Sequence, residues 1–229
     1  MRNKIKVVGV DADDTLWVNQ PYFDDAEKIY ASIMAPYISE ENLLRELLNT
    51  QSRNIPVYGY GVKSFVLSML ETACVQSDNK INADSVQKII EIGKDIFSKQ
   101  VELLDNVDEV LKKLKESYKL ILLTKGDLLD QKRKLRQSKL KDYFHRVEVM
   151  SNKAEDDYAA VFKRNAIKTN EFMMIGNSMK SDIIPVLNLG AYAMHVPYHA
   201  TWAHEVAEEN IDHPRLTRAK NIKSIMDIL

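Results

Sequence analysis

The stretch that decides the fold is "KIKVVGVDADDTLWVN", residues 4–19. An apolar, β-branched run ends there in three carboxylates, Asp11, Asp13 and Asp14, before the chain returns to apolar residues. Clustered carboxylates repel one another and resist burial, so a strand that ends in this way needs a compensating cation. We therefore expect a positive charge beside these acids.

The composition is that of a globular protein, with 45% hydrophobic and 28% charged residues among 229. The 32 basic and 33 acidic residues give a net charge of -1, so we expect neither a nucleic acid nor an anionic membrane as the partner. The apolar runs are too short for a signal peptide or for the ~18 residues of a membrane span. The single cysteine, Cys74, lies in a helical apolar pattern that predicts a buried thiol. We expect a cytoplasmic protein, and monomer and homodimer both stay open.

Five short apolar runs have the length and composition of buried strands. They are "IKVVGV" (5–10), "KLILLT" (119–124), "RVEVM" (146–150), "FMMIGN" (172–177) and "YAMHV" (192–196). Helix-like stretches separate the last four, which is the alternation of βαβ units. The sequence therefore predicts an α/β fold with a Rossmann-like, parallel, five-stranded sheet and helices on both faces.

A long helical block separates the first two of these runs. Apolar residues recur at three-and-four spacing through residues 19–100, and no strand-like run interrupts them. We interpret this block as a small all-helical domain inserted into the sheet domain. The predicted boundaries are 1–18 and 101–229 for the α/β core and 19–100 for the insert.

Polar residues follow the predicted strands, all at the same end of the sheet. In an open parallel sheet, ligands bind outside the carboxyl ends of the strands, so groups distant in sequence are expected to meet there. These candidate site residues are Asp11, Asp13, Thr124, Lys125, Lys153, Asn177 and Asp182.

The candidates form two chemically complementary sets. The carboxylates of Asp11 and Asp182, with the oxygen of Asn177, suit a hard divalent cation such as Mg²⁺. Thr124 and Lys153 suit a phosphoryl group, which they would hold by hydrogen bonds and a point charge. A bound cation together with a lysine would let an anionic carboxylate approach an anionic phosphate.

Four segments carry a resemblance to a known family. "DADDTLW", "LLTKGD", the lysine of "SNKAEDDY" and "IGNSMKSDI" resemble, in order, the four motifs of the haloacid dehalogenase (HAD) superfamily. Most members of that superfamily are magnesium-dependent phosphatases. The helical block lies where the family inserts a cap domain between its first and second motifs.

The resemblance implies a role for each candidate. Asp11 would be the nucleophile that forms an aspartyl phosphate. Asp13 would act as general acid and base, a task that calls for a raised pKa, with its main-chain carbonyl facing the metal. Thr124 and the amide of Lys125 would hold phosphoryl oxygens, and Lys153 would stabilise the developing charge.

The metal set implied by the resemblance is Asp11, Asp13, Asn177 and Asp182. The fourth motif often has two acids or "GD" where this chain has Gly176-Asn177, so one metal-facing carboxylate becomes an amide, which should lower the affinity for Mg²⁺ somewhat. At Lys125 the family often has a small or amide residue, and the sequence leaves open whether this side chain reaches the site.

The resulting prediction is a magnesium-dependent phosphomonoester hydrolase acting on a small phosphorylated metabolite. Alternatives within the family are a phosphomutase, a dehalogenase and a catalytically degenerate protein that binds a phosphorylated ligand. A phospho-acceptor signalling module fits less well, because it would place its aspartate after the third strand. The histidines His195, His199 and His204 match no simple metal-ligand spacing and predict a loop at the rim of the pocket.

Overall fold

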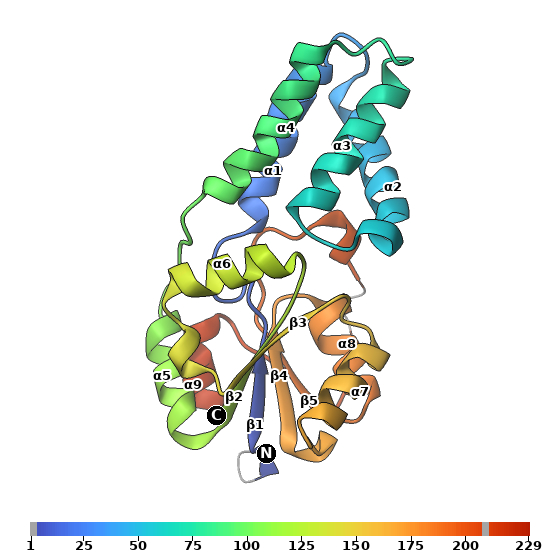
Figure 1. Cartoon of the computed structure of the whole chain (residues 1–229). Helices are drawn as coiled ribbons and strands as arrows, with labels where there is room; N and C mark the ends of the chain where they lie inside the picture. The colour runs from blue at the N-terminus through green and yellow to red at the C-terminus, as the bar shows by residue number, and fades with distance from the viewer. Residues whose placement is uncertain (1–3, 208–210) are drawn as a thin grey trace. The chain divides into compact units, whose positions relative to one another are not determined.

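The computed structural model describes residues 4–207 and 211–229. The chain divides into two compact units, one of Met1–Val18 with Val101–Leu229 and one of Asn19–Gln100. The first unit has an α/β architecture, and the second consists of helices and their connections (Figure 1).

The α/β unit is built on one parallel sheet with the strand order β3-β2-β1-β4-β5-β6. The strands are β1 (Val7–Val10), β2 (Lys119–Lys125), β3 (Arg146–Met150), β4 (Phe172–Gly176), β5 (Tyr192–His195) and β6 (Leu216–Arg218). Five of them coincide with the predicted runs, but the prediction of five strands in all was wrong, since the described residues form six. The sixth is missed because it has three residues, pairs only with β5, and lacks an apolar run.

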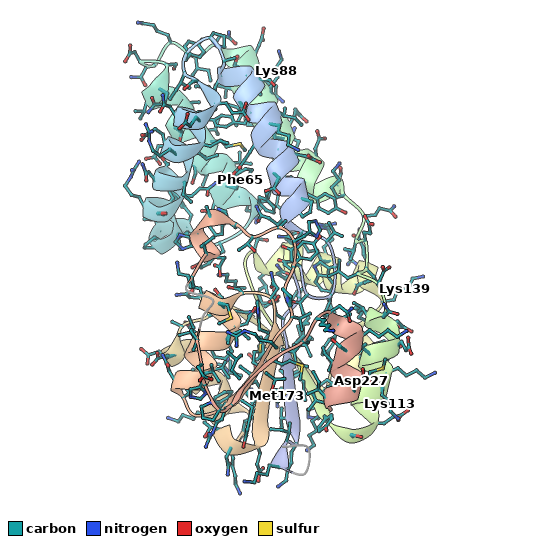
Figure 2. The ribbon with its side chains drawn as sticks, turned by 180° about the vertical axis from the view of Figure 1, so that it is seen from behind. Phe65, Lys88, Lys113, Lys139, Met173 and Asp227 are labelled. Carbon is teal, nitrogen blue, oxygen red and sulfur yellow. The ribbon has the colours of Figure 1, made fainter. Side chains whose placement is uncertain are left out.

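Side chains alternate between the two faces of this sheet, and each face is covered by helices (Figure 1). Leu120 and Leu122 pack into a core with the helices of one face, whereas Ile121 and Leu123 pack into the core of the other. The first layer contains α5 (Val107–Ser117), α6 (Leu128–Ser138) and α9 (Ile225–Ile228), and the second contains α7 (Glu155–Arg164) and α8 (Ile184–Asn188). Met173 of β4 is fully buried within the sheet unit (Figure 2).

The central strand β1 marks the point where the strand order reverses. It pairs with β2 on one side and with β4 on the other, so the chain crosses from one half of the sheet to the other after β3. Ligands of open α/β sheets bind at such a switch point, beyond the carboxyl ends of the strands. Asp11 follows β1 directly and therefore lies at this point.

The helical unit, for which the periodicity predicts helices alone, has four of them. They are α1 (Gln20–Met34), α2 (Glu40–Tyr58), α3 (Val62–Gln76) and α4 (Ala83–Ser98). Their apolar faces meet in one core that includes Tyr30 and Phe65, the latter labelled in Figure 2. The Tyr30 hydroxyl donates to the carbonyl of Met69 at 2.8 Å, so even the polar end of this buried ring is satisfied.

Cys74 corrects one expectation, because its thiol is exposed rather than buried. Its neighbour Ala73 is buried in the helical core, and one residue further along a helix the side chain points about 100° away. None of the helices in the described parts of the chain combines the length and the hydropathy needed to cross a bilayer.

Candidate active site

The carboxylates of Asp11 and Asp182 share one buried ammonium group. Lys153 Nζ donates to Asp11 Oδ1 and, at 2.7 Å, to Asp182 Oδ1. All three side chains are at most 9% exposed, so this cluster is shielded from solvent. The three residues follow β1, β3 and β4, and the structure therefore brings them together as their places at the strand ends predict.

Local backbone structure fixes Asp182 in this position. It lies in a π-helical turn, η4 (Met179–Ile183), where its Oδ2 accepts a hydrogen bond from the Ser178 amide at 3.0 Å. A Cβ added to Gly176 would lie 2.3 Å from the same oxygen, so only glycine leaves room for the carboxylate here. From α7, the Tyr158 hydroxyl donates to the carbonyl of Ser181 at 2.9 Å and holds the turn from below.

Burial and neighbouring charges shift the pKa of both Asp11 and Lys153. Burial and the neighbouring Asp182 raise the pKa of Asp11 to about 7, against the opposing effect of Lys153. Burial disfavours the Lys153 ammonium, but the two carboxylates outweigh it and hold the pKa of Lys153 well above its usual value. Two acids thus compete for one cation, which is the arrangement in which a further positive charge would be favourable.

Oxygen donors for a divalent cation gather around Asp11. The Thr15 hydroxyl lies 2.9 Å from Asp11 Oδ2 and 3.2 Å from Asn177 Oδ1, so it links the first and fourth motifs. Within the described residues, no group of three or more His, Cys, Asp or Glu side chains is arranged to hold a metal. The available set, two carboxylates and an amide oxygen, is hard and incomplete, which fits Mg²⁺ because Mg²⁺ keeps waters and substrate oxygens among its ligands.

Asp13 belongs to a separate cluster. Its carboxylate accepts hydrogen bonds from Trp17 Nε1 at 2.6 Å, from Gln131 Nε2 at 2.7 Å and from Lys134 Nζ at 2.9 Å. Gln131 and Lys134 are three residues apart on α6, so they present their side chains from one helical face. Asp127 caps this helix by accepting from the amides of the second and third helical residues.

The pKa of Asp13 differs from the expectation. Burial alone would raise it, but the charge of Lys134 and the hydrogen bonds from Lys134, Gln131 and Trp17 lower the pKa below its usual value. The side chain is therefore ionised in this arrangement. In this arrangement it is a weakened base, and it must separate from Lys134 before it can take up a proton and donate it.

The two predicted phosphate ligands at the end of β2 have different surroundings. Thr124 is buried, and its hydroxyl donates to the carbonyl of Lys125 at 3.5 Å. The Lys125 ammonium donates to Ser181 Oγ at 2.8 Å and to the carboxylate of Glu205. Glu205 also accepts from Ser178 Oγ at 2.6 Å and from Ser181 Oγ at 2.5 Å, so the Lys125 side chain lies within a third cluster.

Replacing Glu205 by Gln should make the free energy of unfolding fall less steeply as the pH is lowered below 6. Burial opposes its charge, but Lys125 and the two serine hydroxyls lower the pKa of Glu205 from 4.5 to about 2. A lowered carboxyl pKa stabilises the fold above pH 4.5, and this contribution is lost as the pH falls from 4.5 towards 2. Its size is at most about 3 kcal/mol, since burial lowers the pKa of Lys125 and so offsets part of the gain. Urea unfolding of both proteins at pH 6 and pH 3.5 gives the loss in unfolding free energy between these two pH values. An equal loss in the wild type and in Glu205→Gln would contradict the prediction.

Sequence reasoning missed several residues that complete these clusters. Thr15 could have been found, because it lies four residues after Asp11 in the first motif. Gln131 and Lys134 looked like ordinary polar positions of an amphipathic helix. Glu205 lies in a short 3₁₀ turn, η5 (Ala203–Glu205), in the loop predicted to form the rim, and no local pattern distinguishes it. Of the histidines, His195 Nε2 lies 2.9 Å from the Asn177 carbonyl.

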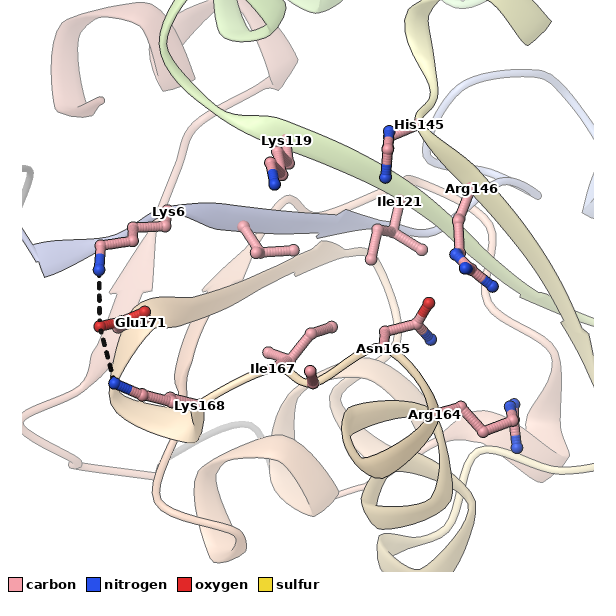
Figure 3. Close-up of a pocket in the computed structure, with 12 residues that line it drawn as sticks. Lys6, Lys119, Ile121, His145, Arg146, Arg164, Asn165, Ile167, Lys168 and Glu171 are labelled. Carbon is pink, nitrogen blue, oxygen red and sulfur yellow. Dashed lines mark hydrogen bonds and ion pairs between the residues drawn. The ribbon is translucent and has the colours of Figure 1, made fainter.

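A cavity of about 390 Å³ lies at the amino ends of the strands, at the other end of the sheet from Asp11 (Figure 3). Residues before or at the amino ends of the strands line it, and most of its charged groups are cationic, among them Lys119 and Arg146. Its one carboxylate, Glu171, pairs with Lys6 at 2.8 Å. The carboxylate of this cavity is therefore paired, and the candidate active site lies at the carboxyl ends of the strands, where Asp11 and Asp182 meet.

Sheet and site together define an α/β enzyme whose reactive groups collect beyond the carboxyl ends of parallel strands. The family model described as haloacid dehalogenase-like hydrolase matches residues 5–190. The chain belongs to this family of hydrolases. No curated protein matches it in sequence.

Solved structures agree with this assignment. A haloacid dehalogenase-like family hydrolase from Xanthomonas campestris is 35% identical, with a TM-score of 0.89 over 98% of this chain and 90% of that one. YfnB from Bacillus subtilis, bound to magnesium, is 15% identical (TM-score 0.65, 99% of both chains). The 2-haloacid dehalogenase from Pseudomonas syringae pv. Tomato DC3000 is 19% identical (TM-score 0.63, 98% of this chain and 97% of that one). The last two show the shared fold alone.

Proposed function

We propose that this hydrolase is a magnesium-dependent phosphatase that acts on a small phosphomonoester through an aspartyl phosphate at Asp11. The observation that carries the proposal is the buried ammonium of Lys153 between the carboxylates of Asp11 and Asp182. It supports the view that two distant acids surround one centre of positive charge. The helical unit, Asn19–Gln100, is proposed as the cap that selects the substrate.

Each residue of the site has a part in this reaction. Asp11 attacks phosphorus, with its second oxygen held by Thr15, and Lys153 stabilises the charge that develops on the phosphoryl oxygens. Thr124 and the amide of Lys125 orient those oxygens. Asp11, Asn177, Asp182 and the carbonyl of Asp13 would hold Mg²⁺, which when bound neutralises phosphoryl oxygens and so admits an anionic ester to an anionic nucleophile.

Asp13 serves as the proton carrier of the two steps. In its ionised form it takes a proton from the water that attacks the aspartyl phosphate. To protonate the leaving oxygen in the first step, it must leave Lys134 and gain a proton. We infer that substrate binding includes this separation.

Dehalogenation is the second candidate, and the pairing of Asp13 favours it. A halide leaves without a proton donor, so a dehalogenase would tolerate a carboxylate locked to Lys134 and Gln131. Asp13 would then have only a structural role. A phosphomutase would use the same site but transfer the phosphoryl group to a second sugar.

Metal removal separates these reactions. We expect hydrolysis of an aryl phosphate to fall by at least about 100-fold on treatment with a chelator and to return with added Mg²⁺. We expect no chloride release from 2-chloropropionate under either condition. Chloride release that the chelator does not change, together with no phosphate hydrolysis, would indicate a dehalogenase instead. Binding of the phosphate ester without turnover would indicate a catalytically degenerate relative.

Replacing Asp13 by Asn tests its role as acid. The rate with an alkyl phosphate, whose leaving oxygen is strongly basic, should fall by about 10²–10⁴-fold. The first step with 4-nitrophenyl phosphate should fall much less, because that leaving group departs without a proton. Single-turnover kinetics with the two esters measures this step, and an equal loss for both would show that Asp13 only supports the structure.

A further inference from the structure

A carboxylate from outside the four motifs contacts residues of the site. Glu205 lies in η5, after the last of the motif-bearing strands, and its side chain is 11% exposed. Three donors converge on it, the ammonium of Lys125 and the hydroxyls of Ser178 and Ser181. Two of these donors lie beside the proposed metal ligands Asn177 and Asp182, and the third follows Thr124. Glu205 therefore contacts both halves of the candidate site.

Lys125 is a second ammonium near the reaction centre. Its Nζ lies 2.8 Å from the hydroxyl of Ser181, the residue before Asp182, so it is a neighbour of the first cluster. An unpaired ammonium in this position would attract a second negative group of a substrate. The contact with Glu205 neutralises it.

The negative charge of Glu205 is more than an anchor for its loop. The loop has another tie to the same turn, because Lys180 Nζ donates to the carbonyl of His204 at 2.7 Å. A neutral side chain at position 205 could also accept the two serine hydroxyls. What requires a carboxylate here is the ammonium of Lys125.

We propose that Glu205 is a specificity-determining residue that neutralises Lys125 and so makes the site favour phosphomonoesters whose alcohol part is uncharged over those that carry a second anionic group. The inference rests on the proposed phosphatase function. The pair is mostly buried and doubly supported by serine hydroxyls, so a substrate carboxylate gains little by competing with Glu205 for the same ammonium. The site then disfavours a substrate with a second anionic group, because the Lys125 ammonium is already paired with Glu205 in the free enzyme.

The test compares two esters of the same chain length, glycerol 3-phosphate and 3-phosphoglycerate, which differ in a hydroxymethyl group against a carboxylate. KM and kcat are measured with Mg²⁺ for the wild type, Glu205→Gln, and the double variant Glu205→Gln with Lys125→Met. We expect Glu205→Gln to lower the KM for 3-phosphoglycerate relative to glycerol 3-phosphate by about tenfold. Loss of the ammonium in the double variant should cancel this gain.

Two results would overturn the inference. One is a KM ratio of the two esters that is unchanged in Glu205→Gln, and the other is a shift of this ratio that persists without the Lys125 ammonium. If Glu205→Gln fails to fold, Glu205→Ala takes its place with the same expected direction. If the wild type hydrolyses neither ester, the dissociation constants of both esters, measured by calorimetry in wild type and variant, decide the inference by the same ratio. The proposed function is decided separately, by the assay with an aryl phosphate.

Discussion

Replacing Asp11 by Asn should abolish phosphate hydrolysis, with a loss of at least about 10⁴-fold in kcat, and leave the fold intact. The amide is nearly isosteric and can still accept from Thr15, but it cannot attack phosphorus. Steady-state rates with an aryl phosphate measure the loss, and circular dichroism checks the fold.

The matched control for this variant is Asp14→Asn, the same chemical change three residues further along. Asp14 has a backbone φ of 62°, which asparagine adopts readily, and it is no part of the proposed machinery. We expect this control to keep most of the activity. A wild-type rate in Asp11→Asn would show that Asp11 is not the nucleophile.

Replacing Lys153 by Met should destabilise the metal-free protein by about 3–5 kcal/mol at pH 8. It leaves the buried carboxylates of Asp11 and Asp182 facing each other without their shared cation. Lys153 lowers the pKa of Asp11, so its removal raises this pKa above about 7; binding a proton then relieves part of the repulsion, and the loss of stability should grow as the pH is raised. Urea unfolding gives the free energy.

Added Mg²⁺ should restore part of this loss, because a divalent cation can take the place of the ammonium between the two acids. The control is Lys132→Met, which removes an exposed lysine from α6 and should change stability by less than about 0.5 kcal/mol. If Lys153→Met loses stability but shows no gain with Mg²⁺ beyond that of the wild type, the two acids do not share a metal.

The sheet was predictable because buried parallel strands read as continuous apolar runs. The run "LILLT", residues 120–124, has to be buried on both faces, and the structure buries it. The strand Leu216–Arg218 gives no such signal, since its three residues at the sheet edge are only partly covered. Short edge strands are defined by their neighbours, which a local pattern does not contain.

The meeting of Asp11, Lys153 and Asp182 was also predictable, because parallel strands end at a common edge. The partners of Asp13 and Lys125 were not. Periodicity shows that α6 is amphipathic but not that Lys134 turns towards an acid over a hundred residues earlier. Contacts of this kind are decided by tertiary packing. Lys134 and Glu205 each place an opposite charge beside a proposed site residue, Asp13 and Lys125.

The measurement that tests the central claim most directly is chemical trapping of the intermediate. The enzyme is mixed with a phosphomonoester and Mg²⁺, quenched in acid and reduced with borohydride, which converts an aspartyl phosphate to homoserine. The account predicts homoserine at position 11 in the digested protein, dependent on Mg²⁺ and absent without substrate. Turnover at the full rate with unmodified Asp11, or with the change at another residue, would contradict it.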